Sequence, residues 1–162
     1  MVIYGIDPGT YQSALVGIDE DFKIIYKLYA DNKEIEIALT QLKKEGGNNT
    51  LCIEFVQSYG MAVGQSTFLT CRAVGRLEKA WGDDDSISLY ARPSILSHIT
   101  GGVRGKKRTQ VRDALRLRFG ESKKGHPLEG IKTHLWDALA VAVYHLDGHK
   151  LGAVDWAKIP VT

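Results

Sequence analysis

Four side chains that can bind a divalent metal ion are spread along the sequence: Asp7, Glu54, His134 and Asp137. Three carboxylates and one imidazole make an oxygen-rich donor set, which suits Mg²⁺ or Mn²⁺ better than zinc. Two such ions can activate a water and stabilise the leaving oxygen of a phosphodiester, so that no side-chain nucleophile is needed. The four residues therefore predict a two-metal hydrolytic site, provided that the fold brings them together.

Each of these residues also has a simpler structural explanation. Asp7 comes directly before a Pro-Gly turn, which an aspartate can cap. Glu54 interrupts an apolar run, and a buried carboxylate there needs either a metal ion or a Lys or Arg partner. His134 and Asp137 are three residues apart, a spacing that places them on one helix face but is also common for surface pairs. His134 can also act on a water or a leaving group instead of binding metal.

Three predicted strands at the N-terminus are the first elements that position these residues. Apolar runs rich in β-branched residues, separated by turn residues, predict strands at Val2–Asp7, Ser13–Ile18 and Lys23–Tyr29. Short connections between them indicate an antiparallel meander. A helix follows, capped by Asp31 or Asn32 and ended by a Gly-Gly pair. The first candidate acid therefore ends a strand.

The other candidate residues lie on a buried strand and a late helix. The run Thr50–Val56 is apolar except for Glu54, which suits a central strand buried on both faces. The segment Thr133–Leu146 has helical periodicity, and its alanines would let that helix approach the sheet closely. Between them the sequence predicts a long helix at about Ala62–Trp81 with an apolar stripe that includes Val63 and Phe68, a strand at Ile87–Tyr90, a short helix beginning at Pro93, and a basic helix ending at about Phe119.

Strands followed by alternating helices and strands predict an α/β fold, with a mixed sheet that begins as an antiparallel meander, continues with parallel strands and is flanked by helices. At 162 residues the chain fits one domain, residues 1–162, with a C-terminal tail from about residue 148. Hydrophobic residues at 44% and charged residues at 25% argue against a disordered or fibrous protein.

Two further expectations concern location and cysteine chemistry. No apolar run approaches the roughly 20 residues of a membrane span, and the N-terminus lacks the profile of a signal peptide, so a cytoplasmic, intracellular protein without membrane partners is expected. Cys52 and Cys71 have apolar neighbours and no metal-binding spacing, so both are expected to be buried thiols.

Positive charge is concentrated in one segment although the whole chain carries a formal charge of only +2. Residues 92–132 hold 11 Lys and Arg against 3 Asp and Glu, whereas residues 1–91 hold 8 against 13. Local clusters of Lys and Arg supply most of the affinity of a protein for nucleic acid. The segment therefore indicates a phosphate-binding surface, with a solvated helix face as the alternative.

Three blocks of this sequence resemble the signature blocks of the RuvC family of Holliday junction resolvases. The blocks are GIDPGT at Gly5–Thr10, CIEFV around Glu54, and HLWDALAVA at His134–Ala142. Their order and spacing agree with the family, and the glycine-containing basic stretch at 101–108 is similar to its DNA-contacting region. The resemblance covers about residues 1–147.

The resemblance implies an RNase H-like nuclease domain and a homodimer formed through the long helix after Glu54. It also implies an endodeoxyribonuclease of DNA recombination and repair, which cuts four-way or other branched DNA by paired nicks. By position, Asp7, Glu54 and Asp137 match the metal-binding acids, and His134 matches a position that holds Asp or His; two Mg²⁺ or Mn²⁺ ions per site are expected, with no small-molecule cofactor. The implied DNA contacts are Arg104, Lys106, Lys107, Arg108 and, as a base-stacking aromatic, Tyr59.

Tyr59 has an alternative interpretation as a half-buried tyrosine at the start of the long helix.

Three other functions are alternatives to junction resolution. One is a related nuclease acting on ribosomal RNA precursors, which the basic segment and the strand glutamate disfavour. Another is an actin-like ATP-binding protein, which needs a second domain and a second phosphate loop. A third is a DNA-binding module of the same fold without catalysis, which the presence of all four site residues disfavours.

Overall fold

The computed structural model of the chain describes residues 1–58, 60, 62–82, 84–102 and 108–150. Within these residues lies a five-stranded sheet with the strand order β3-β2-β1-β4-β5. Its strands are β1 (Val2–Asp7), β2 (Gln12–Asp19), β3 (Ile24–Asp31), β4 (Asn49–Phe55) and β5 (Ile87–Ala91). The first three strands pair antiparallel, whereas β4 pairs parallel with both β1 and β5. The predicted mixed α/β sheet is therefore confirmed.

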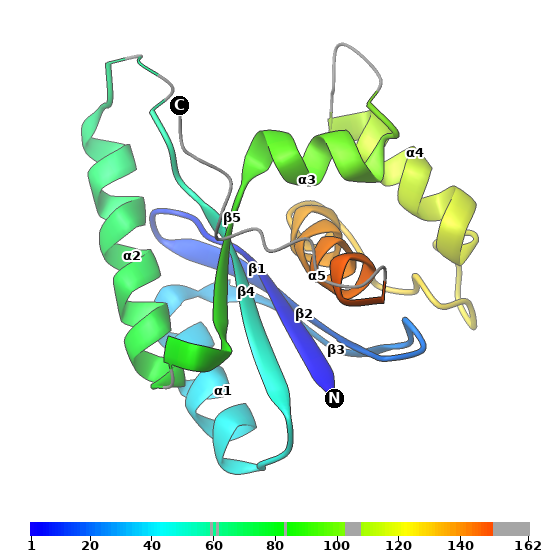
Figure 1. Ribbon diagram of the computed structural model, residues 1–162, viewed down its shortest axis with the longest axis horizontal. Helices are drawn as coiled ribbons and strands as arrows, with labels where there is room; N and C mark the ends of the chain where they lie inside the picture. The colour runs from blue at the N-terminus through cyan, green and yellow to red at the C-terminus, as the bar shows by residue number, and fades with distance from the viewer. Residues whose placement is uncertain (59, 61, 83, 103–107, 151–162) are drawn as a thin grey trace.

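Helices cover both faces of this sheet, as Figure 1 shows. They are α1 (Asn32–Lys44), α2 (Gln65–Trp81), α3 (Arg92–Ile99), α4 (Arg108–Phe119) and α5 (Leu135–Lys150), and a short 3-10 turn, η1 (Asp84–Ser86), precedes β5. One hydrophobic core forms between the sheet and α1 and α2, and the other between the sheet and α5, with α3 and α4 packed behind α5. The three layers follow from strands with apolar side chains on both faces.

The close approach of α5 to the middle of the sheet depends on small residues. A Cβ atom added to Gly5 of β1 would lie 2.3 Å from the carbonyl oxygen of Ala138 and 2.9 Å from the Cβ of Ala142. A side chain at position 5 would therefore push α5 away from β1. The alanines of the late helix allow this contact, as the sequence predicts. Gly5 allows it from the strand, because it has no side chain.

The N-terminal half of α2 differs from the sequence-based expectation. The helix begins at Gln65, three residues later than predicted, and its buried side chains all come from its second half: Ala73, Val74, Leu77 and Trp81. Phe68 is 64% exposed and Val63, before the helix, is 40% exposed. Cys71 is also exposed, so its prediction as a buried thiol is wrong, whereas Cys52 is buried as expected. The apolar stripe continues beyond the part of the helix that the sheet covers.

The last helix is shifted relative to its predicted bounds. It begins at Leu135 and continues to Lys150, so that residues 148–150 belong to the helix. His134 lies in the turn directly before the helix, where its carbonyl accepts a hydrogen bond from the backbone N–H of Ala138 at 3.1 Å. No helix among the described residues is long and apolar enough to cross a membrane.

Candidate metal centre

Two neighbouring parallel strands carry Asp7 and Glu54 to the same edge of the sheet. Ile6 of β1 is in register with Ile53 of β4, so the two acids that follow are side by side. Side chains alternate between the faces of a strand. Because Ile6 and Ile53 belong to the core beneath α1 and α2, Asp7 and Glu54 lie on the opposite face, which α5 covers.

The N-terminal end of α5 brings the remaining two candidates to this edge. Asp137 lies in the first turn of the helix, where the positive end of the helix dipole favours a carboxylate. Thr133 adopts the left-handed backbone conformation, with φ of 44°, directly before His134. A β-branched residue is strained there, and such strain is typical of functional sites. The tight turn at Thr133 orients His134 toward the end of β1.

Asp7, His134 and Asp137 converge on one another. Their potential ligand atoms all lie within 4.8 Å of one another, which makes them a group that can hold a metal ion. The Nδ1 atom of His134 lies 2.8 Å from Oδ2 of Asp7. Asp7 and Asp137 are both buried, whereas the side chain of His134 is 41% exposed. A cation bound here would contact the buried acids on its inner side and remain accessible to solvent on the side of His134.

Glu54 is not part of this three-residue group, and its carboxylate contacts Arg92. The Nη1 atom of Arg92 lies 2.9 Å from both Oε1 and Oε2 of Glu54. The Nη2 atom of the same guanidinium donates to Oδ1 of Asp137 at 3.4 Å. The arginine partner that the sequence left open for Glu54 is thus present, and it also links Glu54 to the group around Asp7.

Burial dominates the electrostatics of the acid cluster. It raises the pKa of Asp7 above the ordinary value of 3.8, and the charge of Asp137 raises it further, whereas the hydrogen bond with His134 lowers it. Burial also raises the pKa of Glu54, against the effect of Arg92. For Arg92, burial lowers the pKa, but Glu54 and Asp137 outweigh this effect and the pKa is raised. An added cation would therefore stabilise the ionised carboxylates.

A buried hydrogen-bond network fixes the turn that follows Asp7. The side chain of Asn32 donates to the carbonyl oxygens of Gly9 and Thr10 at 3.0 and 3.2 Å. Its Oδ1 accepts from the hydroxyl of Ser13 at 2.6 Å, and that hydroxyl accepts from the backbone N–H of Gly9 at 3.2 Å. Asp31, rather than Asn32, caps α1 through its side chain. Asn32 is thereby free to hold the turn that positions Asp7.

Tyr29 packs against the exposed side of the site. Its ring stacks on the ring of His134 with centroids 5.5 Å apart and planes inclined by 26°. With Asp7 on one nitrogen and Tyr29 on one face, the imidazole has a defined orientation. Tyr29 is not among the residues predicted from sequence, because nothing in its own strand indicates that it meets a residue more than a hundred positions away.

Arg92 was also missed, although a signal for it exists. It is the first residue after β5, which is the parallel neighbour of the strand that carries Glu54. The carboxyl ends of adjacent parallel strands form the common binding edge of α/β sheets. A charged residue at that position was therefore a candidate by topology, once β4 and β5 were known to be neighbours.

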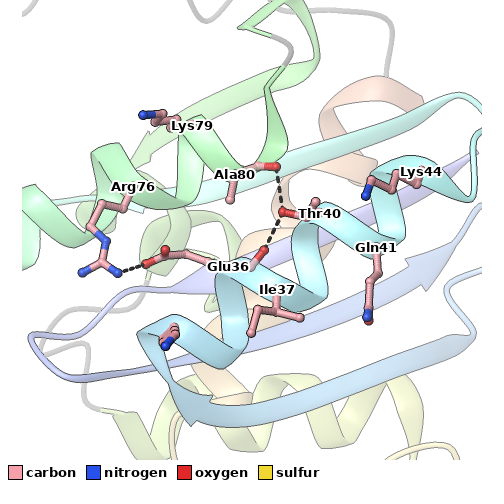
Figure 2. A pocket seen from close by; sticks show the side chains of 9 residues that line it. Glu36, Ile37, Thr40, Gln41, Lys44, Arg76, Lys79 and Ala80 are labelled. Carbon is pink, nitrogen blue, oxygen red and sulfur yellow. Dashed lines mark hydrogen bonds and ion pairs between the residues drawn. The ribbon is translucent and has the colours of Figure 1, made fainter.

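A groove of about 640 Å³ lies away from the acid cluster, between α1 and α2. Figure 2 shows its lining, in which Arg76 pairs with Glu36 at 2.7 Å and the hydroxyl of Thr40 donates to the carbonyl of Glu36. Lys44 and Lys79 add further positive charge at its edges. The groove contains no pair of carboxylates that could hold a metal ion, so the acid cluster is the better candidate for catalysis.

The predicted DNA contacts fall largely outside the part of the chain that the structure describes. Tyr59, Arg104, Lys106 and Lys107 lie outside the described residues, and Arg108 begins α4 without a described side chain. Their role stays a prediction. The described ends of the surrounding segment, at the C-terminus of α3 and the start of α4, lie on the same side of the sheet as α5 (Figure 1).

Comparison with known proteins supplies a fold. No protein-family model matches the chain, and no curated protein matches it in sequence. Among solved structures it is similar to RuvC of Thermus thermophilus, with a TM-score of 0.67 at 18% identity over 94% of this chain and 97% of that chain. The chain has a RuvC-like fold. A second structure, T. thermophilus RuvC in complex with a Holliday junction substrate, gives a TM-score of 0.66 at 18% identity, over 94% of this chain and 96% of that one.

This likeness confirms the fold that the three sequence blocks implied. The chain has the expected α/β arrangement of an RNase H-like fold, with an antiparallel meander extended by parallel strands. At 18% identity the likeness establishes the fold and leaves activity to be argued from the site residues. The two buried acids Asp7 and Asp137 and the partly exposed His134 form a group that can hold a metal ion.

Proposed function

We propose that this chain is an endodeoxyribonuclease that resolves four-way DNA junctions by metal-dependent hydrolysis of phosphodiesters. The observation that carries the proposal is the convergence of Asp7, His134 and Asp137 within 4.8 Å at the carboxyl edge of a RuvC-like sheet. Two buried carboxylates and an accessible imidazole fit Mg²⁺ or Mn²⁺. Glu54, on the adjacent strand, is the proposed fourth ligand.

In the proposed mechanism the protein supplies a rigid, negatively charged frame. When bound, divalent ions would activate a water and neutralise the charge that develops on the phosphate. Asp7 is fixed by the turn that Asn32 holds, and Asp137 by the first turn of α5. His134 is exposed enough to reach a substrate group, and its ring can carry a proton to or from it. Arg92 holds Glu54 in place beside these groups.

The partners belong to the same proposal. The basic segment at 92–132 would bind the phosphate backbone of a branched DNA. A homodimer through α2 would place two sites on one junction, and the exposed Phe68 and Val63 on and before that helix favour a protein partner there. Replacement of Phe68 by Asp should shift the chain from dimer to monomer in sedimentation equilibrium, whereas a wild-type chain that sediments as a monomer would remove this part of the proposal.

The activity test uses a labelled four-way junction and the linear duplex of the same sequence. With Mg²⁺ or Mn²⁺ the wild-type chain should cut the junction by paired nicks and leave the duplex intact. Asp7→Asn should bind the junction without cutting it. Binding without cleavage by the wild-type chain would instead identify a non-catalytic DNA-binding module, and ATP hydrolysis without DNA cleavage an actin-like protein.

A second set of substrates separates the nuclease alternatives. Three-way and flapped DNA, and a structured RNA precursor, should be cut much more slowly than the four-way junction. Faster cutting of the RNA would overturn the junction assignment while leaving the metal centre intact. Replacing Lys106 and Lys107 by Gln should flatten the dependence of junction affinity on salt concentration, and an unchanged salt slope would remove these two residues from the DNA contacts.

A further inference from the structure

Arg92 occupies an unusual position for a cation. It is the first residue of α3, where the positive end of the helix dipole disfavours a positive charge. Its side chain is only 36% exposed, and its guanidinium spans two carboxylates on different elements, Glu54 on β4 and Asp137 on α5. The local helix therefore does not explain an arginine here, whereas the acid cluster does.

The distances between potential ligand atoms divide the four proposed ligands into two sets. Asp7, His134 and Asp137 form one group with ligand atoms within 4.8 Å. Glu54 is excluded from that group, and both of its oxygens lie 2.9 Å from a single nitrogen of Arg92. The guanidinium thus lies where a cation shared by Glu54 and Asp137 would have to bind.

We propose that Arg92 is a built-in counter-ion that takes the place of a second metal ion at Glu54. The free protein then binds one divalent ion at Asp7, His134 and Asp137, and a second ion binds strongly only when Arg92 leaves Glu54. This inference rests on the proposed metal-dependent function. Arg92 is a positioning residue in this scheme, because it acts on the metal ions through Glu54.

The physical reason is the repulsion between like charges. A guanidinium and a divalent ion that share one carboxylate are only a few ångströms apart, and in a partly buried site this repulsion is weakly screened. Binding of the second ion must therefore break the contact between Arg92 and Glu54. The released guanidinium needs a new anionic partner, and a phosphate group suits its planar fork. A DNA backbone that enters the site supplies that partner and favours loading of the second ion.

The test measures Mn²⁺ binding to the full chain without DNA, by isothermal titration calorimetry and by the electron paramagnetic resonance of free Mn²⁺. The wild-type chain should bind one Mn²⁺ tightly and a second much more weakly. Arg92→Gln should bind the second ion at least about tenfold more tightly than the wild type does. Arg92→Lys keeps the charge and should stay close to the wild type.

A matched control removes an arginine from another ion pair. Arg76 contacts Glu36 at 2.7 Å, far from the acid cluster, so Arg76→Gln makes the same change in charge and should leave both Mn²⁺ affinities unchanged. Glu54→Gln tests the same site while Arg92 is retained. It should remove the second Mn²⁺ site and leave the affinity of the first site within about twofold of the wild-type value. Circular dichroism verifies that each variant is folded.

The outcomes separate this inference from the function on which it rests. An intact first site with the same second affinity in the wild type, Arg92→Gln and Arg76→Gln overturns the role of Arg92 alone. Two equally tight ions in the wild-type chain also overturn it. A folded wild-type chain that binds no Mn²⁺ overturns the proposed metal-dependent function, and the inference with it.

Discussion

Asp137 and Asp147 lie on the same helix, about 15 Å apart along its axis, and have opposite surroundings. Asp137 lies at the positive end of the α5 dipole, among other carboxylates, and shares the guanidinium of Arg92 with Glu54. Asp147 lies near the negative end of the same helix. It accepts hydrogen bonds from Nη1 and Nη2 of Arg118 at 2.7 and 2.6 Å, and His98 lies 2.7 Å away.

The two clusters differ in whether the cationic partners or burial have the larger effect on the pKa of the carboxylates. Burial raises the pKa of Asp147, but Arg118 and His98 outweigh it, so the net pKa is lowered. In the acid cluster burial and mutual repulsion prevail, and the pKa of Asp7 and that of Glu54 are raised. A carboxylate with partners of its own ties α3, α4 and α5 together. A buried carboxylate whose pKa is raised, as for Asp7 and Glu54, is costly to the fold when ionised, which indicates a site kept for binding or catalysis.

The largest expected difference between the two clusters is in activity. Asp137→Asn should lower junction cleavage by about 10³-fold or more, because it removes a proposed ligand from the reacting centre. Asp147→Asn, compared at equal concentration of folded protein, should cleave at close to the wild-type rate. Single-turnover cleavage of a labelled junction measures both. Equal loss in the two variants would mean that the distinction between the clusters is wrong.

Metal ions should stabilise the protein through the acid cluster around Asp7 and not through the Asp147 cluster. At a Mn²⁺ concentration about 100 times its Kd, the free energy of unfolding should rise by about 2.7 kcal/mol through mass action. The increase should persist in Asp147→Asn, disappear in Asp7→Asn and be reversed by chelation. Thermal unfolding with and without Mn²⁺ gives the comparison, and stabilisation of Asp7→Asn by the full amount would place the ion elsewhere.

Loss of the Asp147 contacts should destabilise the fold. Hydrogen bonds to charged groups contribute up to a few kcal/mol, so Asp147→Asn should lower the free energy of unfolding by about 2 kcal/mol. Because its folded pKa is lowered, this contribution is present above the ordinary value of 3.8 and is lost as the pH falls through the folded value. Urea unfolding at pH 7 and pH 3 should therefore show a smaller difference between variant and wild type at pH 3 than at pH 7.

The smallest effect should have the opposite sign. In metal-free buffer at pH 7, Asp7→Asn should raise the free energy of unfolding by about 1 kcal/mol, because it removes a buried charge that lacks sufficient pairing. The folded pKa of Asp7 is raised, so its favourable contribution is full below 3.8 and is lost as the pH rises through the folded value. The gain of the variant should thus be absent at pH 3 and present at pH 7. A destabilised variant at pH 7 would show that the His134 contact outweighs burial.

Much of the fold follows from local sequence patterns. The strand at Val2–Asp7 has the predicted bounds, and the runs around Ser13–Ile18 and Thr50–Val56 form strands within a residue or two of their predicted ends. These patterns are apolar runs and the Gly, Pro and Asp residues of turns. They extend over a few residues, so they can be recognised without knowing which parts of the chain the strand contacts. The contact of α5 with the sheet was likewise indicated by small residues on that helix.

Residue types and spacing alone indicated the four candidate site residues: Asp7 at a strand end, Glu54 in an apolar strand, and His134 near Asp137. How these residues are grouped depends on contacts between distant parts of the chain. The tertiary structure placed Arg92 against Glu54, stacked Tyr29 on His134 and left Phe68 exposed on α2. These relations join residues that are distant in the chain. They depend on strand register and helix placement, which a local pattern does not encode, because the same apolar stripe or charged side chain can meet the sheet, solvent or a partner.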